Sequence, residues 1–581
     1  MDATRAIYAT AQTVLSEWGQ GEGRSRALIR LKATGFNRVI LEGYRAGVTV
    51  DEALLHETRD FFRREGFEVL GGLMPVHGEG FGKKAHGVEL RGSYFCYSAE
   101  ETVEALEAEI RKLARVFDAI VIDDAFLTAC RCPSCLAACG PGDPFAFRRD
   151  LLCRVAERWV AAAREENGAV RVIVKFPQYY DRYARFGYDI ERFPDIFDAV
   201  WVGTETRNPD TIEYGYVEPY QGYVNAQWMR TCAGNVFESA WFDGLDCDEQ
   251  LFYDQGLTTY LAAVPALTVF SYDEDLFGGS KITRFAGAMP DFERLRRLAA
   301  SPRGMHVLKP KTGDGGRDLF IFDYLGMLGI PSVFVTRLTS AMRSVFVSAH
   351  GVEDVETIAA MKAILAAGGQ VIITFEALHR MIDNENFLEI FGFDRSGVAR
   401  AVVPATCFGV MHERFETETP VHLAGDLAPF DASVLAWGAV VSEEQGTICV
   451  PLVTSKTYAG GGRALVWNLC TFGHEAFRVT EQLNVPERVT WFGLPKALVD
   501  LLRGSATETL GFRVAMLPRV ACFVFERHVV LVNYTSGMKE VHVQGLHLAA
   551  DTLFSNAAST SCAGSDVLLA PHSFAAVEIH E

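Results

Sequence analysis

The fold is decided by the stretch "FDAIVIDDAFLTACRCPSC", residues 117–135. A short apolar run from Phe117 ends in Asp123 and Asp124 and leads into closely spaced cysteines. Such a run, rich in β-branched residues, predicts a buried strand of a parallel sheet. Acids directly after a strand occupy the position where a (β/α)8 barrel carries its chemistry. The N-terminal half of the chain repeats this pattern.

Seven further apolar runs alternate with amphipathic stretches such as residues 98–116, for which Ser98 is the expected N-cap. Eight βα units in roughly 270 residues predict a (β/α)8 barrel, the TIM barrel. The alternative is an open doubly wound sheet, but no nucleotide-binding glycine motif follows an early strand. The predicted strands are residues 5–10, 37–43, 67–73, 117–123, 171–176, 197–203, 235–242 and 266–272.

Beyond the barrel the sequence pattern changes twice. Residues 303–505 mix short apolar runs such as "QVIITFEAL" from Gln370 with helical patterns, which predicts a second, smaller α/β domain. Residues 506–581 alternate apolar and polar residues with period two, which predicts a small antiparallel β-sandwich. We therefore expect three domains, residues 1–302, 303–505 and 506–581.

Charge and composition exclude several classes of protein. The 581 residues carry a net charge of −19, which opposes nucleic acid or an anionic membrane as a partner. The first twenty residues lack a signal peptide, and no apolar run has the roughly 18 residues of a membrane span. We expect a cytoplasmic protein. The 13 cysteines are an odd number without a secretion signal, so a disulfide framework is not expected.

Ionisable and aromatic side chains follow most of the predicted strands. Together they are typical of a sugar pocket, because sugar hydroxyls bond to charged groups and sugar C–H faces stack on aromatic rings. The expected substrate is therefore a carbohydrate. The expected substrate-binding residues are Glu42, Tyr44, Arg45, His77, Lys175, Tyr179, Arg207, Trp241 and Asp273.

Glycosidic cleavage requires a pair of carboxyl groups. Successive strand residues point to opposite faces, so we expect one of Asp123 and Asp124 in the pocket and favour Asp124. The other acid would orient it or pair with Lys175 or Arg207. The expected partner is Glu205, or else Asp243, because strands six and seven lie across the barrel mouth from strand four. For Glu205 the alternative is a purely structural salt bridge to Arg207.

The cysteines Cys130, Cys132 and Cys135 have C-x-C-x-x-C spacing, which can wrap three thiolates around one metal ion. Cys96, in the loop after strand three, is the expected fourth ligand, and Cys139 competes with it. Four thiolates close a tetrahedron, so the expected metal is a structural zinc. Unligated buried cysteines are the alternative, and a catalytic thiol is disfavoured because the segment has no activating His. No organic cofactor is expected.

This arrangement of cysteines resembles that of the glycoside hydrolase family 42 β-galactosidases, in which it binds a structural zinc. The resemblance implies that residues 303–505 form a glutamine-amidotransferase-like domain used for assembly, and hence a homo-oligomer, a dimer or a trimer. That domain lacks a G-x-C-x-G nucleophile elbow, so no amidase activity is expected. The catalytic motifs differ from the family's Asn-Glu after strand four and Glu after strand seven, since Asp123-Asp124 and Trp241-Phe242-Asp243 stand there.

The phrases "IDDAFLTACRCPSC", "VKFPQYYDRY" and "GTETRNPD" are also similar to motifs of an uncharacterised group of bacterial barrel proteins related to glycoside hydrolases. The sequence therefore predicts a glycoside hydrolase of carbohydrate metabolism. The crowded rim favours exo action on short oligosaccharides or glycosides. One alternative is a glycoside phosphorylase, with Lys175, Arg207 and Arg45 available for phosphate. The other is a catalytically silent sugar-binding or assembly protein.

Overall fold

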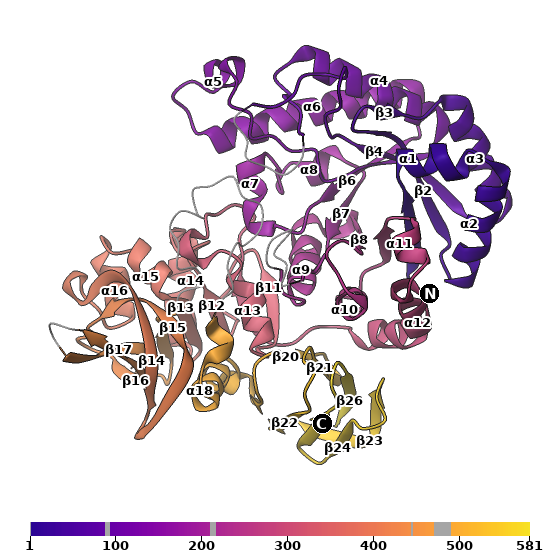
Figure 1. The fold of residues 1–581 in the computed structure, drawn as a ribbon. Coiled ribbons are helices and arrows are strands. Elements are labelled where there is room, and N and C mark those ends of the chain that lie inside the picture. The colour runs from indigo at the N-terminus through magenta and orange to yellow at the C-terminus, as the bar shows by residue number, and fades with distance from the viewer. Residues whose placement is uncertain (1, 87–92, 209–216, 443–445, 470–489, 581) are drawn as a thin grey trace. The chain divides into compact units, whose positions relative to one another are not determined.

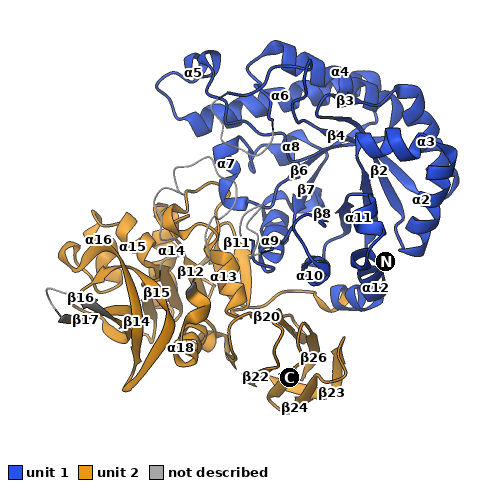
Figure 2. Ribbon diagram, viewed as in Figure 1, with its two compact units in different colours: residues 1–296, 480–486 blue, residues 297–479, 487–581 orange. Residues whose placement is uncertain are grey.

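The structure is a computed structural model that describes residues 2–86, 93–208, 217–442, 446–469 and 490–580. The chain divides into two compact units (Figure 2). The first comprises residues 1–296 with 480–486, and the second comprises residues 297–479 with 487–581. The three-domain division at residues 302 and 505 stays a prediction.

The first unit contains a closed barrel of eight parallel strands (Figure 1). Each strand lies beside the next barrel strand along the chain, and β1 pairs with both β2 and β9, which closes the ring. The predicted TIM barrel is confirmed. Its strands are β1 (Thr4–Ala9), β2 (Arg38–Arg45), β4 (Glu68–Met74), β5 (Ala119–Ile122), β6 (Arg171–Phe176), β7 (Ala199–Gly203), β8 (Phe237–Asp243) and β9 (Ala266–Phe270), and β3 (Val48–Thr49) pairs antiparallel to β2.

Side chains fill the barrel interior, among them Tyr8, Ile40, Val121, Trp201 and Trp241. Amphipathic helices cover the outside of the ring (Figure 1). The main ones are α2 (Gly21–Ala33), α3 (Glu52–Arg64), α4 (Glu100–Val116), α6 (Pro144–Glu166), α9 (Gln221–Ala233), α10 (Glu249–Leu261) and α12 (Ser280–Leu298), with the single-turn α8 (Phe193–Ile196) between β6 and β7.

The expected N-cap Ser98 is wrong. Helix α4 begins at Glu100 and its cap position is Ala99, which has no capping side chain. The Ser98 hydroxyl instead accepts a hydrogen bond from Cys135 Sγ at 3.2 Å. The Ser98 hydroxyl is therefore bonded to the Cys135 thiol and does not cap the helix.

The second unit begins with an α/β sheet, which confirms the predicted α/β fold after the barrel. Five strands run parallel in the order β11 (Ser332–Val335), β10 (Met305–Leu308), β12 (Ser344–Val347), β13 (Gln370–Thr374) and β18 (Arg463–Trp467). Four long antiparallel strands extend it in the order β17 (Gly446–Thr457), β16 (Ser433–Ser442), β14 (Val398–Val410) and β15 (Glu413–Leu427). These four were not predicted from the sequence.

Two four-stranded antiparallel sheets complete the second unit, as predicted for the C-terminal β domain. One has the order β19 (Arg513–Ala515), β22 (Lys539–Gln544), β25 (Asp566–Leu569) and β24 (Ser561–Ala563). The other has the order β20 (Val520–Val524), β21 (His528–Asn533), β26 (Phe574–His580) and β23 (His547–Ser555). Residues from both sheets, such as Val514, Leu531 and Val541, share one apolar core.

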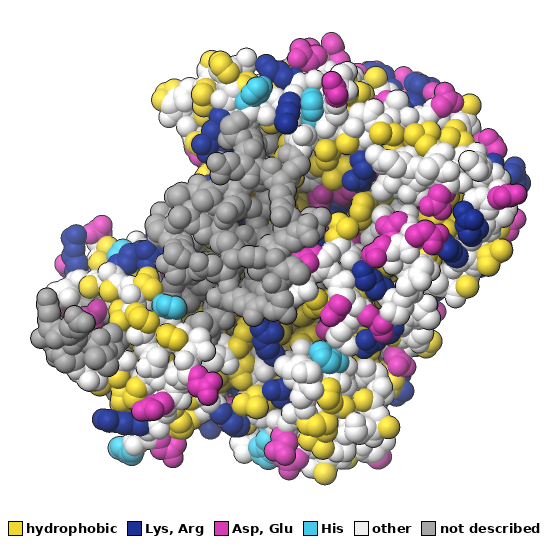
Figure 3. All heavy atoms as spheres, viewed as in Figure 1, with side chains coloured by type: hydrophobic (Ala, Val, Ile, Leu, Met, Phe, Trp, Pro, Cys, Tyr) yellow, Lys and Arg dark blue, Asp and Glu magenta, His cyan; other side chains and the backbone are white. Residues whose placement is uncertain are grey.

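The surface and the helices bear on possible partners. In the part of the chain that the structure describes, no helix combines the length and the apolar character needed to cross a bilayer. On the face drawn in Figure 3, Lys and Arg side chains are interspersed with Asp and Glu.

Candidate active site

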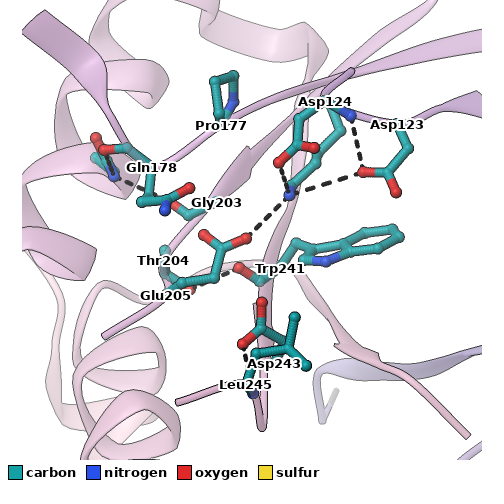
Figure 4. A network of polar contacts seen from close by, with 12 residues as sticks. Asp123, Asp124, Pro177, Gln178, Gly203, Thr204, Glu205, Trp241, Asp243 and Leu245 are labelled. Carbon is teal, nitrogen blue, oxygen red and sulfur yellow. Dashed lines mark hydrogen bonds and ion pairs between the residues drawn. The ribbon is translucent and has the colours of Figure 1, made fainter. Parts of the chain in front are cut away.

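Four charged side chains from three strand ends meet at one nitrogen (Figure 4). The Lys175 Nζ lies 2.5 Å from Asp124 Oδ2 and 2.9 Å from Glu205 Oε1. It also lies 3.7 Å from Asp123 Oδ1 and 4.9 Å from the centre of the Trp241 ring. The Lys175 and Glu205 side chains are each 2% exposed, whereas Asp124 is 23% exposed. Asp124 is therefore the acid of this cluster that is most open to solvent.

Both Asp123 and Asp124 approach Lys175, whereas the strand pleat predicts only one acid in the pocket. The reason is that β5 ends at Ile122, so the alternation of a strand stops before the two acids. The Asp124 backbone N–H donates to Asp123 Oδ1 at 2.8 Å, which belongs to a turn rather than to a strand. The turn brings both carboxylates to the same ammonium.

A second group of polar contacts adjoins Asp123. Arg45 Nη2 lies 3.6 Å from Asp123 Oδ2 and 2.8 Å from Glu42 Oε1. Glu42 is fully buried and accepts hydrogen bonds from the Tyr8 hydroxyl at 2.7 Å and the Ala11 N–H at 2.6 Å. The two Glu42 oxygens are thus occupied, and Glu42 anchors Arg45 beside the acid pair.

Asp243 at the end of β8 is held by a bidentate ion pair. Arg207 donates to both Asp243 oxygens, at 2.8 and 2.9 Å, and the Leu245 N–H donates to Asp243 Oδ1 at 2.9 Å. Both partners are buried. Arg207 thus pairs with Asp243, while Glu205 pairs with Lys175.

Burial shapes the ionisation of the acids and of the lysine. Burial and the neighbouring Asp124 carboxylate raise the pKa of Asp123 to about 7, although Lys175 and Arg45 oppose the shift. Burial also raises the pKa of Glu205, with Lys175 again opposing. Burial lowers the pKa of Lys175, but the three carboxylates outweigh this effect and hold its pKa well above the usual range. The site therefore holds a protonated lysine beside two acids, Asp123 and Glu205, whose pKa values are raised.

The position of Glu205 depends on a glycine. A Cβ atom at Gly203 would lie 2.2 Å from Glu205 Oε2, so only glycine leaves room for the carboxylate as it is placed. Among the described residues, the buried Glu205 Oε2 has no hydrogen-bond partner. Within the part of the chain that the structure describes, one oxygen of Glu205 is thus bonded to Lys175, and the other is buried without a hydrogen-bond partner.

A family model described as "Probable glycosyl hydrolase, catalytic domain" matches residues 2–294, which is the barrel. The chain belongs to this family. An uncharacterised protein of Saccharolobus solfataricus is 23% identical over 364 residues, which cover 56% of this chain and 59% of that protein. The match therefore spans less than two thirds of that relative's length.

The chain also resembles solved structures over its whole length. An α-L-fucosidase from Paenibacillus thiaminolyticus has a TM-score of 0.64 at 12% identity, with 100% of each chain covered. A family 42 β-galactosidase from G. stearothermophilus has a TM-score of 0.60 at 12% identity, covering 100% of this chain and 98% of its own. A β-galactosidase from Halorubrum lacusprofundi has a TM-score of 0.63 at 14% identity, with 99% of each covered. At these identities the likeness shows the fold alone, and it confirms the predicted architecture.

The barrel unit also carries the four-cysteine cluster. The Sγ atoms of Cys96, Cys130, Cys132 and Cys135 all lie within 4.8 Å of one another and are buried. Cys96 Sγ lies 3.8 Å from Cys132 Sγ and 3.6 Å from Cys135 Sγ. A tetrahedral zinc with Zn–S bonds of about 2.3 Å has S···S edges of about 3.8 Å. The four thiols therefore fit a metal ion, and Cys139 lies outside this group.

Several predicted sugar ligands have other contacts. The Tyr44 hydroxyl donates to the Val76 carbonyl at 3.0 Å, and the His77 ring packs against Phe95. Asp273 caps helix α11 (Glu274–Phe277), since its Oδ1 accepts from the Leu276 N–H at 2.8 Å.

Two predicted aromatic ligands lie at the acid cluster but are almost completely buried. Trp241 is 2% exposed and lies beneath Lys175, and Tyr179 is 4% exposed. Burial, with Asp124 nearby, raises the pKa of Tyr179 well above its usual range. Neither ring has an open face for a sugar in this conformation.

Sequence reasoning missed four residues that shape the candidate site. Tyr8 bonds Glu42, and the Tyr188 hydroxyl donates to the Asp124 carbonyl. Asn225 Nδ2 donates to the carbonyls of Gln178 at 2.8 Å and Gly203 at 2.9 Å, which ties the ends of β6 and β7 together. Gly203 makes room for Glu205. Tyr8 could have been found from its position near the end of β1, where each barrel strand meets its loop.

Proposed function

We propose that this glycosyl hydrolase cleaves glycosidic bonds with the carboxyl pair Asp124 and Glu205, with retention of anomeric configuration. One observation carries the proposal. Asp124 Oδ2 and Glu205 Oε1 bond the same Lys175 nitrogen at 2.5 and 2.9 Å, so they lie no farther apart than the sum of these distances, 5.4 Å. Retaining enzymes separate their carboxyl groups by about 5–5.5 Å and inverting enzymes by about 6.5–9.5 Å.

The environments of the two acids support different roles. Asp124 is the more exposed acid and its carboxylate is stabilised by the ammonium, which suits a nucleophile. Burial raises the pKa of Glu205, which suits a general acid. Asp124 attacks the anomeric carbon, and the leaving oxygen takes the Glu205 proton. Water then attacks the same carbon, returns a proton to Glu205 and releases the Asp124 carboxylate.

The charge pairing favours hydrolysis over phosphorolysis. A phosphorylase needs cations for its phosphate, and Lys175, Arg207 and Arg45 were the expected ones. Each of them is already paired with a carboxylate at 2.9 Å or less. Exo action on short oligosaccharides or glycosides is supported by the burial of the cluster, where only Asp124 is substantially exposed.

A panel of aryl glycosides and oligosaccharides tests the proposal, with the product anomer followed by NMR. We expect the retained anomer, a loss of kcat/KM of about 10³-fold or more in Asp124→Asn and Glu205→Gln, and no effect of added phosphate. Inversion, sugar 1-phosphate as the product, or unchanged turnover in either variant would contradict it. A protein without turnover that still binds sugars would support the silent alternative.

We also propose that the cysteine cluster holds a structural zinc, because four buried thiols at tetrahedral spacing leave no open coordination position. Metal analysis should find about one zinc per chain in the parent and in Cys139→Ser, whose thiol lies outside the cluster. Cys132→Ser should lose the metal and melt at a lower temperature. Equal zinc content in the two variants would contradict the assignment.

Assembly and location are further proposals. A dimer or trimer formed through the α/β part of the second unit is supported by the resemblance to family 42. A cytoplasmic location is supported by the cysteines of the described residues, which form no disulfide. Native mass spectrometry should show a single oligomer, and a monomer at all concentrations would contradict the first proposal.

A further inference from the structure

We propose that Lys175 is a positioning residue that holds Asp124 and Glu205 at their working separation and in their working charge states, and that it does not bind the sugar. The inference rests on the proposed function and deepens it. It changes the role that the sequence predicts for Lys175 from substrate contact to internal support.

The ammonium of Lys175 is buried and surrounded by carboxylates. An ammonium has three N–H donors. The Lys175 Nζ has carboxylate oxygens at 2.5, 2.9 and 3.7 Å, from Asp124, Glu205 and Asp123. The Trp241 ring lies against it at 4.9 Å, and the side chain is 2% exposed. Two donors therefore make hydrogen bonds to Asp124 and Glu205, and the third N–H has the Asp123 carboxylate within ion-pair distance.

The barrel topology places Lys175 between Asp124 and Glu205. Strand β6 lies between β5 and β7, pairing with both in parallel register. Asp124 follows β5 and Glu205 follows β7, so the two acids come from opposite sides of the strand that carries Lys175. One side chain on the middle strand can therefore fix the separation of groups that belong to the outer two.

Among the charged groups around Asp124 and Glu205, Lys175 is the cation that bonds both carboxylates directly. Beyond the three acids, the nearest charged groups are Arg45, which is paired with Glu42, and Arg207, which is paired with Asp243. The buried phenols of Tyr179 and Tyr183 also face the acids, and each has a pKa that burial holds well above the usual range. None of these groups replaces the direct bonds of Lys175 to Asp124 and Glu205.

The same charges exclude a nucleophilic lysine. A lysine that forms a Schiff base needs a lowered pKa, so that the free amine is present. Here the surrounding carboxylates keep the ammonium protonated. The role left to Lys175 is electrostatic and geometric.

The test is the pH dependence of turnover in Lys175→Met, with Arg171→Gln as the matched control. Arg171 lies on the same strand at its other end and pairs with the exposed Glu238. We expect Lys175→Met to lower kcat by about 10²-fold with little change in KM, because the acid pair loses its alignment. The acidic limb of the kcat/KM profile should move up by about 1–3 pH units, since loss of a nearby cation raises carboxyl pKa values. Arg171→Gln should keep the parent profile.

Three outcomes would overturn the proposal. A raised KM with unchanged kcat and an unmoved limb would identify Lys175 as a sugar contact. A lower kcat at every pH without movement of the limb would indicate a merely structural role. Parent-like kinetics in Lys175→Met would leave Lys175 with no role in the reaction.

A second measurement separates this proposal from the proposed function. In Lys175→Met the folded-state pKa of Glu205, which burial raises and Lys175 lowers, should rise further above its unfolded value, so stability is lost as pH rises through the folded value. The deficit in melting temperature against the parent should therefore grow between about pH 4 and pH 8. This readout needs no turnover: if the parent hydrolyses no glycoside the proposed function fails, and a deficit independent of pH still overturns the role of Lys175.

If Lys175→Met does not fold, a second substitution still tests the proposal. Adding Asp124→Asn to Lys175→Met removes the surplus buried charge and should restore folding and raise the melting temperature. If the double variant is no more stable than Lys175→Met, charge pairing is not what Lys175 supplies, and the proposal fails.

Discussion

Replacing Gly203 by alanine is expected to displace the Glu205 carboxylate and lower kcat by about 100-fold. The new Cβ would lie 2.2 Å from Glu205 Oε2 and 3.0 Å from Glu205 Cδ. An unstrained contact of this kind is about 3.5 Å long, so the carboxylate must retreat by more than about 1 Å. The bond from Lys175 Nζ to Glu205 Oε1, now 2.9 Å, would then be stretched or broken.

The surrounding backbone cannot absorb this movement. The Cβ would also lie 2.8 Å from the backbone nitrogen of Gln178. The Gln178 carbonyl is fixed by Asn225 Nδ2 at 2.8 Å and Gln221 Nε2 at 2.6 Å. The Glu205 side chain must therefore give way, and the remaining close contact with the Gln178 nitrogen adds an overpacking cost of about 1–3 kcal/mol in the free energy of unfolding.

The assay is kcat and KM with whichever glycoside the panel identifies, together with thermal unfolding. Gly168→Ala is the matched control, because a Cβ at Gly168 meets no atom within 4 Å. We expect the control to keep the parent kcat. If Gly203→Ala also keeps the parent kcat and melting temperature, then the placement of Glu205 does not depend on Gly203 and the reasoning is refuted.

Three further predictions follow from buried charge and helix propensity. Burial raises the pKa of Asp123 to about 7 from an unfolded value near 4, so the parent loses stability as pH rises from about 4 to 7. The melting temperature of Asp123→Asn relative to the parent should therefore rise over that window and then level off. A difference in melting temperature that is constant with pH would contradict this. Asp243→Asn should lower the free energy of unfolding by about 3–5 kcal/mol, because it removes the charge that pairs with the buried Arg207. Chemical denaturation measures this loss, and a loss below about 1 kcal/mol would contradict the prediction. Gly287→Ala should raise the free energy of unfolding by about 0.5–1 kcal/mol, since Gly287 is exposed within α12 and a Cβ there meets no atom within 4 Å. The same denaturation experiment measures this change, and a lower free energy of unfolding would contradict the prediction.

The barrel could be predicted because its strands are buried on both faces, so each one is a nearly continuous apolar run. Strand β6 has the bounds that the sequence predicts, Arg171–Phe176. The antiparallel strands β14 and β15 were missed because many of their residues are exposed and glycine and proline interrupt them. Gly409, for example, lies under the Trp437 ring, a contact between β14 and β16 that no local pattern reveals.

The site was predicted as a set of positions but not as a set of pairs. Asp124, Glu205 and Asp273 all follow barrel strands, and the sequence predicts all three in the pocket, the first two as catalytic acids and Asp273 as a substrate ligand. Asp273 is a helix cap, and its spacing of three residues to the bonded Leu276 N–H is the signal that could have separated it. The pairing of Glu205 with Lys175 depends on which strands are neighbours and on which side chains point inward, and that is set by the closed barrel.

The cysteine cluster and the two acids Asp123 and Asp124 share one short loop, so the position of the acids depends on the position of the cysteines. Only residues 125–129 separate Asp124 from Cys130, and all of them are buried. The Thr128 N–H donates to the Phe186 carbonyl at 2.9 Å, and the Arg131 N–H donates to the His86 carbonyl at 2.8 Å. A loop fixed at Cys130 and at these bonds has few conformations left, which limits how far Asp124 can move from Lys175. The cluster therefore restrains Asp124, whose Oδ2 lies within 5.4 Å of Glu205 Oε1.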